Sequence, residues 1–219
     1  MFKNLTYEQK EERFNSLIDY AEKIRNKSLK NACVSILTDY KEELFSRGAG
    51  HDGIENKKFT RTHQCFDGGL LDHIYNVTTI AYNIALNYGE KVDIDLVLFG
   101  AILHDIGKVK IFDKYNENNE IKSNLNYSYL LVDHLYIGEK IVEEYLNKEK
   151  ISEKFKYQAL HIIATHMDTM EKHMAEAYIV SYADSIDAYI ENIISYPRNA
   201  FNPLNNEYYY ESENPTKYE

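Results

Sequence analysis

Cysteine is scarce in this chain, with only Cys33 and Cys65 among 219 residues. Two cysteines cannot build the disulfide framework that stabilises small secreted domains, so a reducing compartment is the simpler expectation. No apolar run approaches the length of a membrane span, and the charged start MFKNLTYEQKEERF lacks the apolar core of a signal peptide. These absences predict a cytoplasmic protein without a membrane partner.

Basic residues are in the minority. The 25 lysines and arginines are outnumbered by 35 aspartates and glutamates, which gives a formal net charge of −10. A protein that binds long duplex nucleic acid usually presents a basic face, because neutralising phosphates dominates its affinity. The charge balance therefore argues against a broad nucleic-acid binder. It leaves open an enzyme that acts on nucleotides or short strands.

Proline is absent from residues 1–196, because all three prolines follow residue 196. Proline breaks helices, and apolar residues recur with helical spacing through much of this span. We therefore predict an all-α fold, a helical bundle with an irregular C-terminal tail. The expected helices lie at about residues 6–26, 28–46, 69–88, 93–106, 129–147, 152–168 and 173–195. A glycine-rich break at 48–53 and a polar loop at 113–127 interrupt them.

The apolar helical segments nevertheless carry ionisable side chains. The histidines among them are His73, His104, His134, His161 and His166. The last expected helix adds Asp184 on its apolar stripe, with Asp187 beside it. Taken singly, each histidine is better explained as a hydrogen-bonded core residue. Their repetition favours a shared metal site, because burying such groups is costly and imidazole with carboxylate suits a divalent transition ion.

The segment GAILHDIGKV, residues 100–109, places His104 and Asp105 at the end of a strongly apolar helix. Both residues can serve one site if the helix ends there, and Gly107 is a natural helix terminator. The turn would leave Lys108 free to reach a bound anion. His161 is set apart, because it lies five residues before His166 and therefore on another helix face.

The order His73, His104-Asp105, Asp184 resembles the HD superfamily of metal-dependent phosphohydrolases, which have an all-helical fold. Longer segments look like its YhaM-type exoribonuclease branch. These segments are THQCFDGGLLDHIYNV, AILHDIGKV, LVDHLYIGEKIV, LHIIATHMD and AYIVSYADSIDAYIE. The likeness covers about residues 62–191.

The resemblance also implies a set of metal ligands. A first divalent ion would be held by His73, His104, Asp105 and Asp184. A second ion would be held by His134 and His166, with Asp105 between the two. The implied cofactor is therefore one or two divalent transition ions per chain, of manganese, iron, nickel or cobalt.

Further residues match positions near the substrate. Asp105 and Lys108 are the expected catalytic residues, and Lys108 matches a phosphate-contacting lysine. His63 matches a histidine near the substrate. The local basic segment ENKKFTRTH at 55–63, which includes Arg61, is expected to contact phosphates, with a solvated loop as the open alternative.

Three parts of the chain are expected. Residues 1–60 form N-terminal helices packed on the HD domain, residues 61–196 form that domain, and residues 197–219 form the tail. The branch usually carries an oligonucleotide-binding domain where this chain predicts helices. The acidic, tyrosine-rich segment 207–214 leaves a surface tail and a contact in a homo-oligomer as alternatives.

The predicted function is a metal-dependent phosphohydrolase that cleaves a phosphoester or phosphodiester in a nucleotide or a short single strand. The local motifs favour a YhaM-like 3'-5' exonuclease. The alternatives are a nucleotide or deoxynucleotide phosphohydrolase, and a non-catalytic HD protein that senses a nucleotide.

Overall fold

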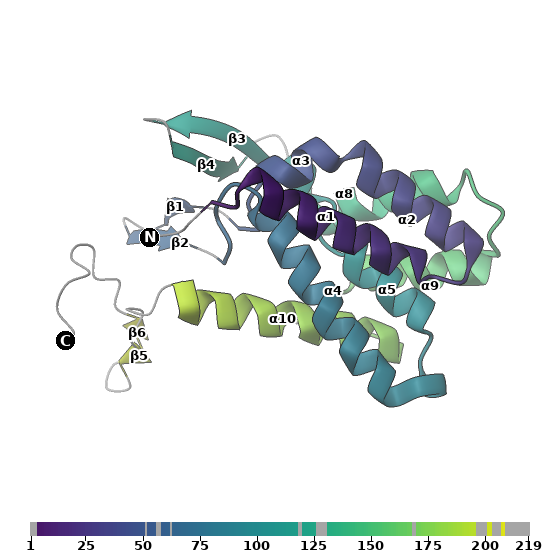
Figure 1. Cartoon of the computed structure of the whole chain (residues 1–219). Coiled ribbons are helices and arrows are strands. Elements are labelled where there is room, and N and C mark those ends of the chain that lie inside the picture. The colour runs from purple at the N-terminus through teal and green to yellow at the C-terminus, as the bar shows by residue number, and fades with distance from the viewer. Residues whose placement is uncertain are drawn as a thin grey trace.

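The structure is a computed structural model that describes residues 4–50, 52–55, 58–61, 63–117, 120–125, 131–167, 170–195, 201–202 and 207–208. Its body is a bundle of helices, as Figure 1 shows, which confirms the all-α prediction. The helices are α1 (Tyr7–Glu22), α2 (Lys27–Asp39), α3 (Lys41–Ser46), α4 (Gly69–Tyr88), α5 (Ile94–Leu103), α6 (Lys108–Ile111), α8 (His134–Leu146), α9 (Glu153–Ala164) and α10 (Ala175–Ser195), with a short 3-10 turn at Gly89–Lys91. None of these helices is both long enough and apolar enough to cross a bilayer.

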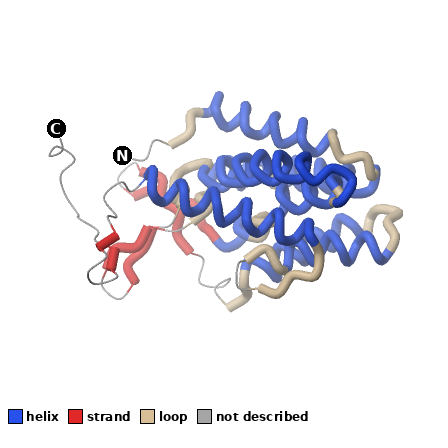
Figure 2. Tube along the Cα trace, turned by 90° about the horizontal axis from the view of Figure 1, so that it is seen from below, coloured by secondary structure: helices blue, strands red, loops and turns tan. Residues whose placement is uncertain are grey.

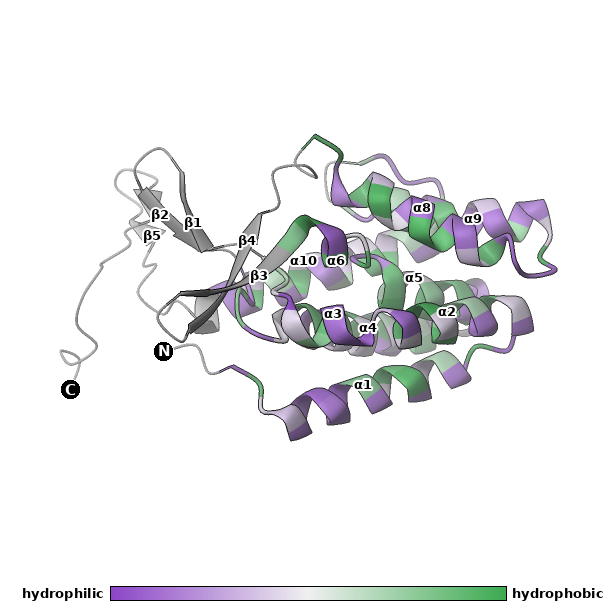
Figure 3. Cartoon of the chain, turned by 90° about the horizontal axis from the view of Figure 1, so that it is seen from above, coloured by the Kyte–Doolittle hydropathy of each residue, from purple (hydrophilic) through white to green (hydrophobic). Residues whose placement is uncertain are grey.

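Helix α5 is the centre of the bundle. Every residue from Asp95 to Leu103 is buried, and the helix is green in Figure 3 because nearly all of its residues are hydrophobic. It packs against α4, α10, α9, α2 and α1. A helix that is apolar all round has to be enclosed in this way. The central helix therefore ends, at Leu103, inside the bundle rather than at its surface.

Side-chain caps fix where several helices begin. The Thr6 side chain forms a capping box with Gln9 at the start of α1, and Asp93 caps α5 by accepting from two backbone N–H groups. Asp133 caps α8 in the same way, through the N–H of Leu135. Such caps satisfy donors that have no partner within the helix. The cap at Asp133 makes His134 the first residue of α8.

The N-terminal helices pack on the rest of the bundle. Helix α1 lies against α4, and α2 lies against α8. Arg13 pairs with Asp72 at 2.9 Å across the α1–α4 contact, and the Tyr20 hydroxyl lies 3.3 Å from that of Thr79. These contacts hold the first two helices against the later ones; the division of the chain into three parts stays a prediction.

The helix expected at 28–46 is two helices. Tyr40, with φ −107° and ψ 15°, separates α2 from α3. The residues after α3 also differ from the expectation of N-terminal helices up to residue 60. There β1 (Asp52–Glu55) pairs antiparallel with β2 (Lys58–Arg61). These short strands are red in Figure 2.

The prediction of a loop at 113–127 was wrong for the described residues. Strands β3 (Phe112–Glu117) and β4 (Glu120–Leu125) form an antiparallel hairpin, from the pair Phe112–Leu125 to the pair Glu117–Glu120. Only Ile121 and Leu125 are apolar in β4, and Ser123 between them is polar, so the period of two that indicates a strand is incomplete. In the predicted tail, the described residues form two short paired strands, β5 (Phe201–Asn202) and β6 (Glu207–Tyr208).

Gly107 does not end a helix, so that expectation was wrong. Its φ of −60° and ψ of −26° are right-handed, and α5 has already ended at Leu103. Glycine is needed there for a close approach, because a Cβ at position 107 would lie 2.0 Å from the backbone oxygen of His134. The absence of a side chain therefore lets the turn after α5 lie directly on the start of α8.

We expect Gly107→Ala to destabilise the fold by about 1–3 kcal/mol, because backbone atoms have to move to admit the methyl group. Thermal unfolding of the metal-free protein measures this. Gly89→Ala is the control for a glycine with open space: no atom lies within 4 Å of a Cβ there, although its φ of 58° adds some strain. A Gly107→Ala protein as stable as wild type would show that the α8 contact is loose.

Candidate metal centre

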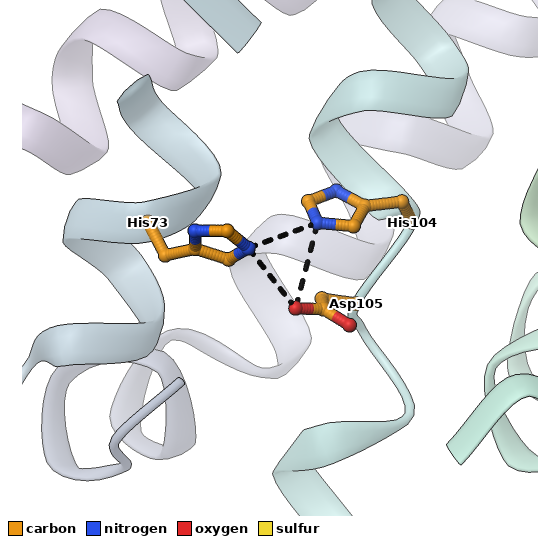
Figure 4. A group of neighbouring side chains, drawn as sticks. All are labelled: His73, His104 and Asp105. Carbon is orange, nitrogen blue, oxygen red and sulfur yellow. Dashed lines mark hydrogen bonds and ion pairs between the residues drawn. The ribbon is translucent and has the colours of Figure 1, made fainter. Parts of the chain in front are cut away.

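Three buried side chains meet where α4 approaches the end of α5. His73 comes from α4, and His104 and Asp105 follow the last residue of α5 (Figure 4). The Nε2 atoms of the two histidines are 3.3 Å apart. Asp105 Oδ2 lies 3.3 Å from Nε2 of His73 and 3.4 Å from Nε2 of His104. These atoms are close enough together to hold one metal ion.

Helix α10 adds a second carboxylate to this group. Asp184 Oδ1 lies 3.1 Å from His73 Nε2 and 3.9 Å from His104 Nε2. The structure thus brings together all four residues predicted for the first ion, from three separate helical segments. Two imidazole nitrogens and two carboxylate oxygens are a donor set suited to a divalent transition ion.

The other oxygen of Asp105 faces a second group. Oδ1 lies 3.6 Å from His134 Nε2 and 3.5 Å from His166 Nε2. His134 begins α8, and His166 follows the end of α9. These three residues could also hold an ion, and Asp105 is common to both groups. Its two oxygens therefore point toward two adjacent candidate positions.

Contacts at Nδ1 fix the orientation of the four imidazoles. Each Nδ1 faces an oxygen: His73 faces Asp187 at 2.7 Å, His104 the carbonyl of Ala101 at 2.8 Å, His166 the carbonyl of Ile163 at 2.8 Å, and His134 faces Asp133 at 2.6 Å. The contacts of His73, His104 and His166 are hydrogen bonds to oxygens that carry no hydrogen, so these three rings donate from Nδ1. The contact of His134 with Asp133 is close but lies outside hydrogen-bond geometry. A neutral ring then presents the lone pair of Nε2 to the site, as metal-binding histidines do.

Buried polar atoms that lack a hydrogen bond also indicate that the site suits a metal ion. Both oxygens of Asp105 and Nε2 of His134 and His166 are buried without a hydrogen bond. Lys108 Nζ lies 2.6 Å from Asp105 Oδ2 as an ion pair, but outside hydrogen-bond geometry. Buried polar atoms without partners are costly. Cations at the two candidate positions would satisfy all four atoms, so the residues present suit such ions.

A cavity of about 250 Å³ opens beside these groups. Its polar lining comes from Asp105, Lys108, His134, His166 and Asp184, together with His63 and Ser185. The remaining wall is made by Met167, Ala188 and Tyr189. A bound phosphate would therefore face the candidate metal positions and the Lys108 ammonium at once.

Comparison with known proteins identifies the family. The model of the HD domain matches residues 70–189, which is more than half of the chain. The chain belongs to the HD domain family. This confirms the predicted family and, with the relatives below, the prediction of a metal-dependent phosphohydrolase. The matched residues contain every predicted metal ligand.

Two kinds of relative resemble this HD protein. Dihydroneopterin 2',3'-cyclic phosphate phosphodiesterase of Methanocaldococcus jannaschii is 29% identical over 193 residues, covering 81% of this chain and 70% of the relative. The 3'-5' exoribonucleases YhaM of Bacillus licheniformis and Bacillus subtilis are each 24% identical, covering 83% and 82% of this chain. The chain spans about half the length of the YhaM proteins, 55% and 54%. No solved structure matches it.

The other residues that the sequence analysis singled out near the site are His63, Arg61 and His161. His63 packs on His73, with ring centroids 4.6 Å apart. Arg61 ends β2, and its side chain lies outside the described part of the structure. His161 lies in neither candidate group; its Nε2 accepts the backbone N–H of His173 at 3.1 Å, and the two rings stack.

Two buried residues were not predicted to act in the site. Asp187 accepts from His73, and Gln64 donates to the same carboxylate oxygen at 3.0 Å. Asp187 lies three residues after Asp184, so the helical period places both carboxylates toward the same histidine. That spacing could have identified Asp187. Nothing in the sequence around Gln64 distinguishes it from an ordinary loop residue.

The charges around His73 favour its protonated form in the metal-free protein. Burial opposes a charge on the ring, but the carboxylates of Asp105, Asp184 and Asp187 outweigh burial and raise the pKa of His73 well above its usual value. The pKa of Asp105 is held well below its usual range, because Lys108 and His104 outweigh the cost of burial. A proton on His73 thus occupies part of the space that an ion would take.

Metal binding should therefore strengthen as the pH rises. Protonated His73 stabilises the metal-free fold. This contribution is complete below about pH 6.5, the pKa of the ring in the unfolded chain, and it is lost as the pH rises through the higher pKa of the folded protein. An ion binds only the neutral ring, so binding displaces that proton. We expect manganese to raise the melting temperature more at about pH 8.5 than at about pH 6.

The protonation of two other histidines, His63 and His134, should not change metal binding between these two pH values. Burial lowers the pKa of His63 to about 3 and that of His134 to about 4, so both rings are already neutral. Thermal melts with and without metal at both pH values measure the difference. Equal increases in melting temperature would contradict the displacement of a proton from His73.

Proposed function

We propose that this HD protein hydrolyses a phosphodiester bond in a nucleotide or a short single strand, using one or two divalent ions such as manganese, iron, nickel or cobalt. The main support is the set of unsatisfied buried atoms on Asp105, His134 and His166 beside a small cavity that contains Lys108. Atoms placed in this way suit cations, and cations with an ammonium group suit a phosphate.

The proposed metal ligands are His73, His104, Asp105 and Asp184 for one ion, and Asp105, His134 and His166 for another. When bound, such ions lower the pKa of a water molecule and polarise the phosphoryl group. The protein's part is to hold the ligands rigidly. The contacts at Nδ1 keep each Nε2 aimed at the site, so no imidazole has to reorient during the reaction.

Lys108 is proposed to hold the phosphate. Its side chain is 14% exposed and lines the cavity next to Asp105. Cations at Asp105 would compete with the ammonium group for the carboxylate, which leaves its three donors available to phosphate oxygens. The ammonium group then stabilises the negative charge that develops on those oxygens when the ester bond breaks.

The size of the cavity favours a small substrate. About 250 Å³ accommodates a phosphate with part of a sugar or ring, whereas a duplex has no room to approach the buried ligands. The M. jannaschii relative is named for a small cyclic phosphate, which agrees with a small substrate. The YhaM relatives favour a second candidate, exonucleolytic removal of nucleotides from the 3' end of a strand. That activity also needs only one nucleotide at the site.

A substrate panel with manganese tests the proposal. We expect ribodinucleotides to be cleaved at least about tenfold faster, by kcat/KM, than a long RNA duplex, because a duplex cannot place its phosphates in the cavity. Products are separated by chromatography. Cleavage of the duplex as fast as a dinucleotide would contradict the proposed size limit. Tight nucleotide binding without turnover would instead support the sensor alternative. A cytoplasmic location and a homo-oligomer stay predictions from the sequence.

A further inference from the structure

Gln64 is a buried polar residue in an unusual backbone conformation. It has no exposed surface, and its φ is 42°, the left-handed region that side chains other than glycine rarely adopt. Its backbone oxygen accepts from the N–H of Ala49 at 3.1 Å. A Cβ on Gly69 would lie 1.9 Å from that same oxygen, so the loop fits closely against the start of α4. The surrounding structure thus holds Gln64 in one arrangement.

The side-chain amide of Gln64 bridges His63 and Asp187. One end of the amide lies 3.0 Å from Asp187 Oδ2, and the other lies 2.9 Å from His63 Nδ1. Asp187 Oδ2 is a carboxylate oxygen that also accepts from His73, so the amide end that faces it must be the nitrogen. The amide oxygen therefore faces His63. The hydrogen bonds alone therefore identify which end of the amide is the oxygen.

The same argument determines which ring nitrogen of His63 carries the hydrogen. An amide oxygen only accepts hydrogen bonds, so His63 Nδ1 must donate to it. A neutral ring that donates from Nδ1 carries a lone pair on Nε2. Within the described part of the chain, Nε2 of His63 has no hydrogen-bond partner. His63 lines the cavity, and so this ring offers an acceptor to whatever binds there.

An acceptor is a poor contact for the phosphate itself. Phosphoester oxygens at neutral pH are acceptors as well, so they would be repelled by the lone pair of Nε2. Lys108 is the cavity's cationic donor and suits the phosphate. A hydroxyl group beside the phosphoester is the simplest partner for His63, because it can donate to Nε2 while the phosphate binds elsewhere in the cavity.

We propose that His63 accepts a hydrogen bond from a substrate hydroxyl on the carbon next to the phosphoester, and that Gln64 positions His63 for this contact. The proposal rests on the phosphodiesterase function proposed above and names its substrate class, phosphoesters of sugars or polyols with a neighbouring hydroxyl. Gln64 does not touch the substrate. It acts by fixing the tautomer of His63 and by tying that ring, through Asp187, to His73.

The kinetic test compares a ribodinucleotide, ApA, with its deoxy counterpart, dApdA, using manganese. We expect wild type to prefer ApA by at least about tenfold in kcat/KM, since a buried acceptor loses its donor with dApdA. His63→Ala and Gln64→Met should both bring the ratio close to one. Gln158→Met makes the same change on α9, away from the residues that line the cavity, and should keep the wild-type ratio.

Bis(p-nitrophenyl) phosphate separates the two proposals, because this diester has no hydroxyl. If wild type cleaves neither it nor the dinucleotides with any divalent ion, the proposed function fails. If wild type cleaves it and also cleaves ApA and dApdA equally well, only the hydroxyl proposal is overturned. A Gln64→Met protein that keeps the full preference for ApA overturns the positioning role of Gln64.

A spectroscopic test does not depend on activity. Nitrogen-15 NMR of the metal-free protein distinguishes the two neutral tautomers of a histidine ring. We expect the hydrogen of His63 on Nδ1 in wild type, and a mixture with the Nε2 form in Gln64→Met. A change in stability alone would not move this signal. A wild-type ring with its hydrogen on Nε2 would overturn the proposal, because that ring offers the cavity a donor.

Discussion

Replacing Asp105 by asparagine should remove bound metal and lower kcat/KM by at least about 10³-fold, the largest effect expected of any single change in this chain. Asp105 is 1% exposed, and its two oxygens face the two candidate ion positions. Asparagine keeps the shape of the side chain but removes the negative charge, and its NH₂ group would point toward one of the ions. The loss should therefore affect both positions at once.

Elemental analysis of the purified protein, after loading with manganese and gel filtration, measures the metal directly. Asp19→Asn is the matched control, because it makes the same change on the exposed side of α1. The control should bind as much metal as wild type and have the same kcat/KM. An Asp105→Asn protein that is folded and retains its metal would show that Asp105 is a structural carboxylate paired with Lys108.

The gathering of the candidate ligands was predictable because burial is costly for ionisable groups. His104 and Asp105 follow a helix that is almost entirely apolar, so the sequence placed them inside the molecule with no solvent to satisfy them. The same reasoning applied to His73, His134 and His166. The helical period and the absence of proline were sufficient for the bundle, since both act over many residues and do not depend on any single contact.

The contacts that hold the candidate ligands in position were not predictable in the same way. Gln64 reaches Asp187 only because its backbone adopts a positive φ, which no local pattern indicates. The role of Gly107 depends on the carbonyl of His134, which lies beyond the β3–β4 hairpin in the sequence. Such contacts join distant segments at the level of single atoms, whereas periodicity reports only which face of a helix is buried.

Replacing His134 by alanine should remove one ion and leave the other bound. His134 contacts the shared carboxylate Asp105 only through Oδ1, the oxygen that faces away from His73 and His104. The first group keeps all four of its ligands in this variant, so one ion should stay bound. We expect the metal content to fall from about two ions per chain to about one, and kcat to fall about 10²-fold, because two ions hold both the nucleophile and the phosphate oxygens.

His161→Ala is the matched control, because it removes a partly exposed imidazole that contacts His173 and lies in neither group. It should keep the wild-type metal content and turnover. The fold of His134→Ala is checked by thermal unfolding without metal, where the loss of one partly buried ring at the start of α8 should have a small effect. Near-normal turnover of His134→Ala at saturating manganese would contradict a second catalytic ion. In that case the Nε2 atoms of His134 and His166 would serve the fold, and the reaction would depend on the single ion between α4, α5 and α10.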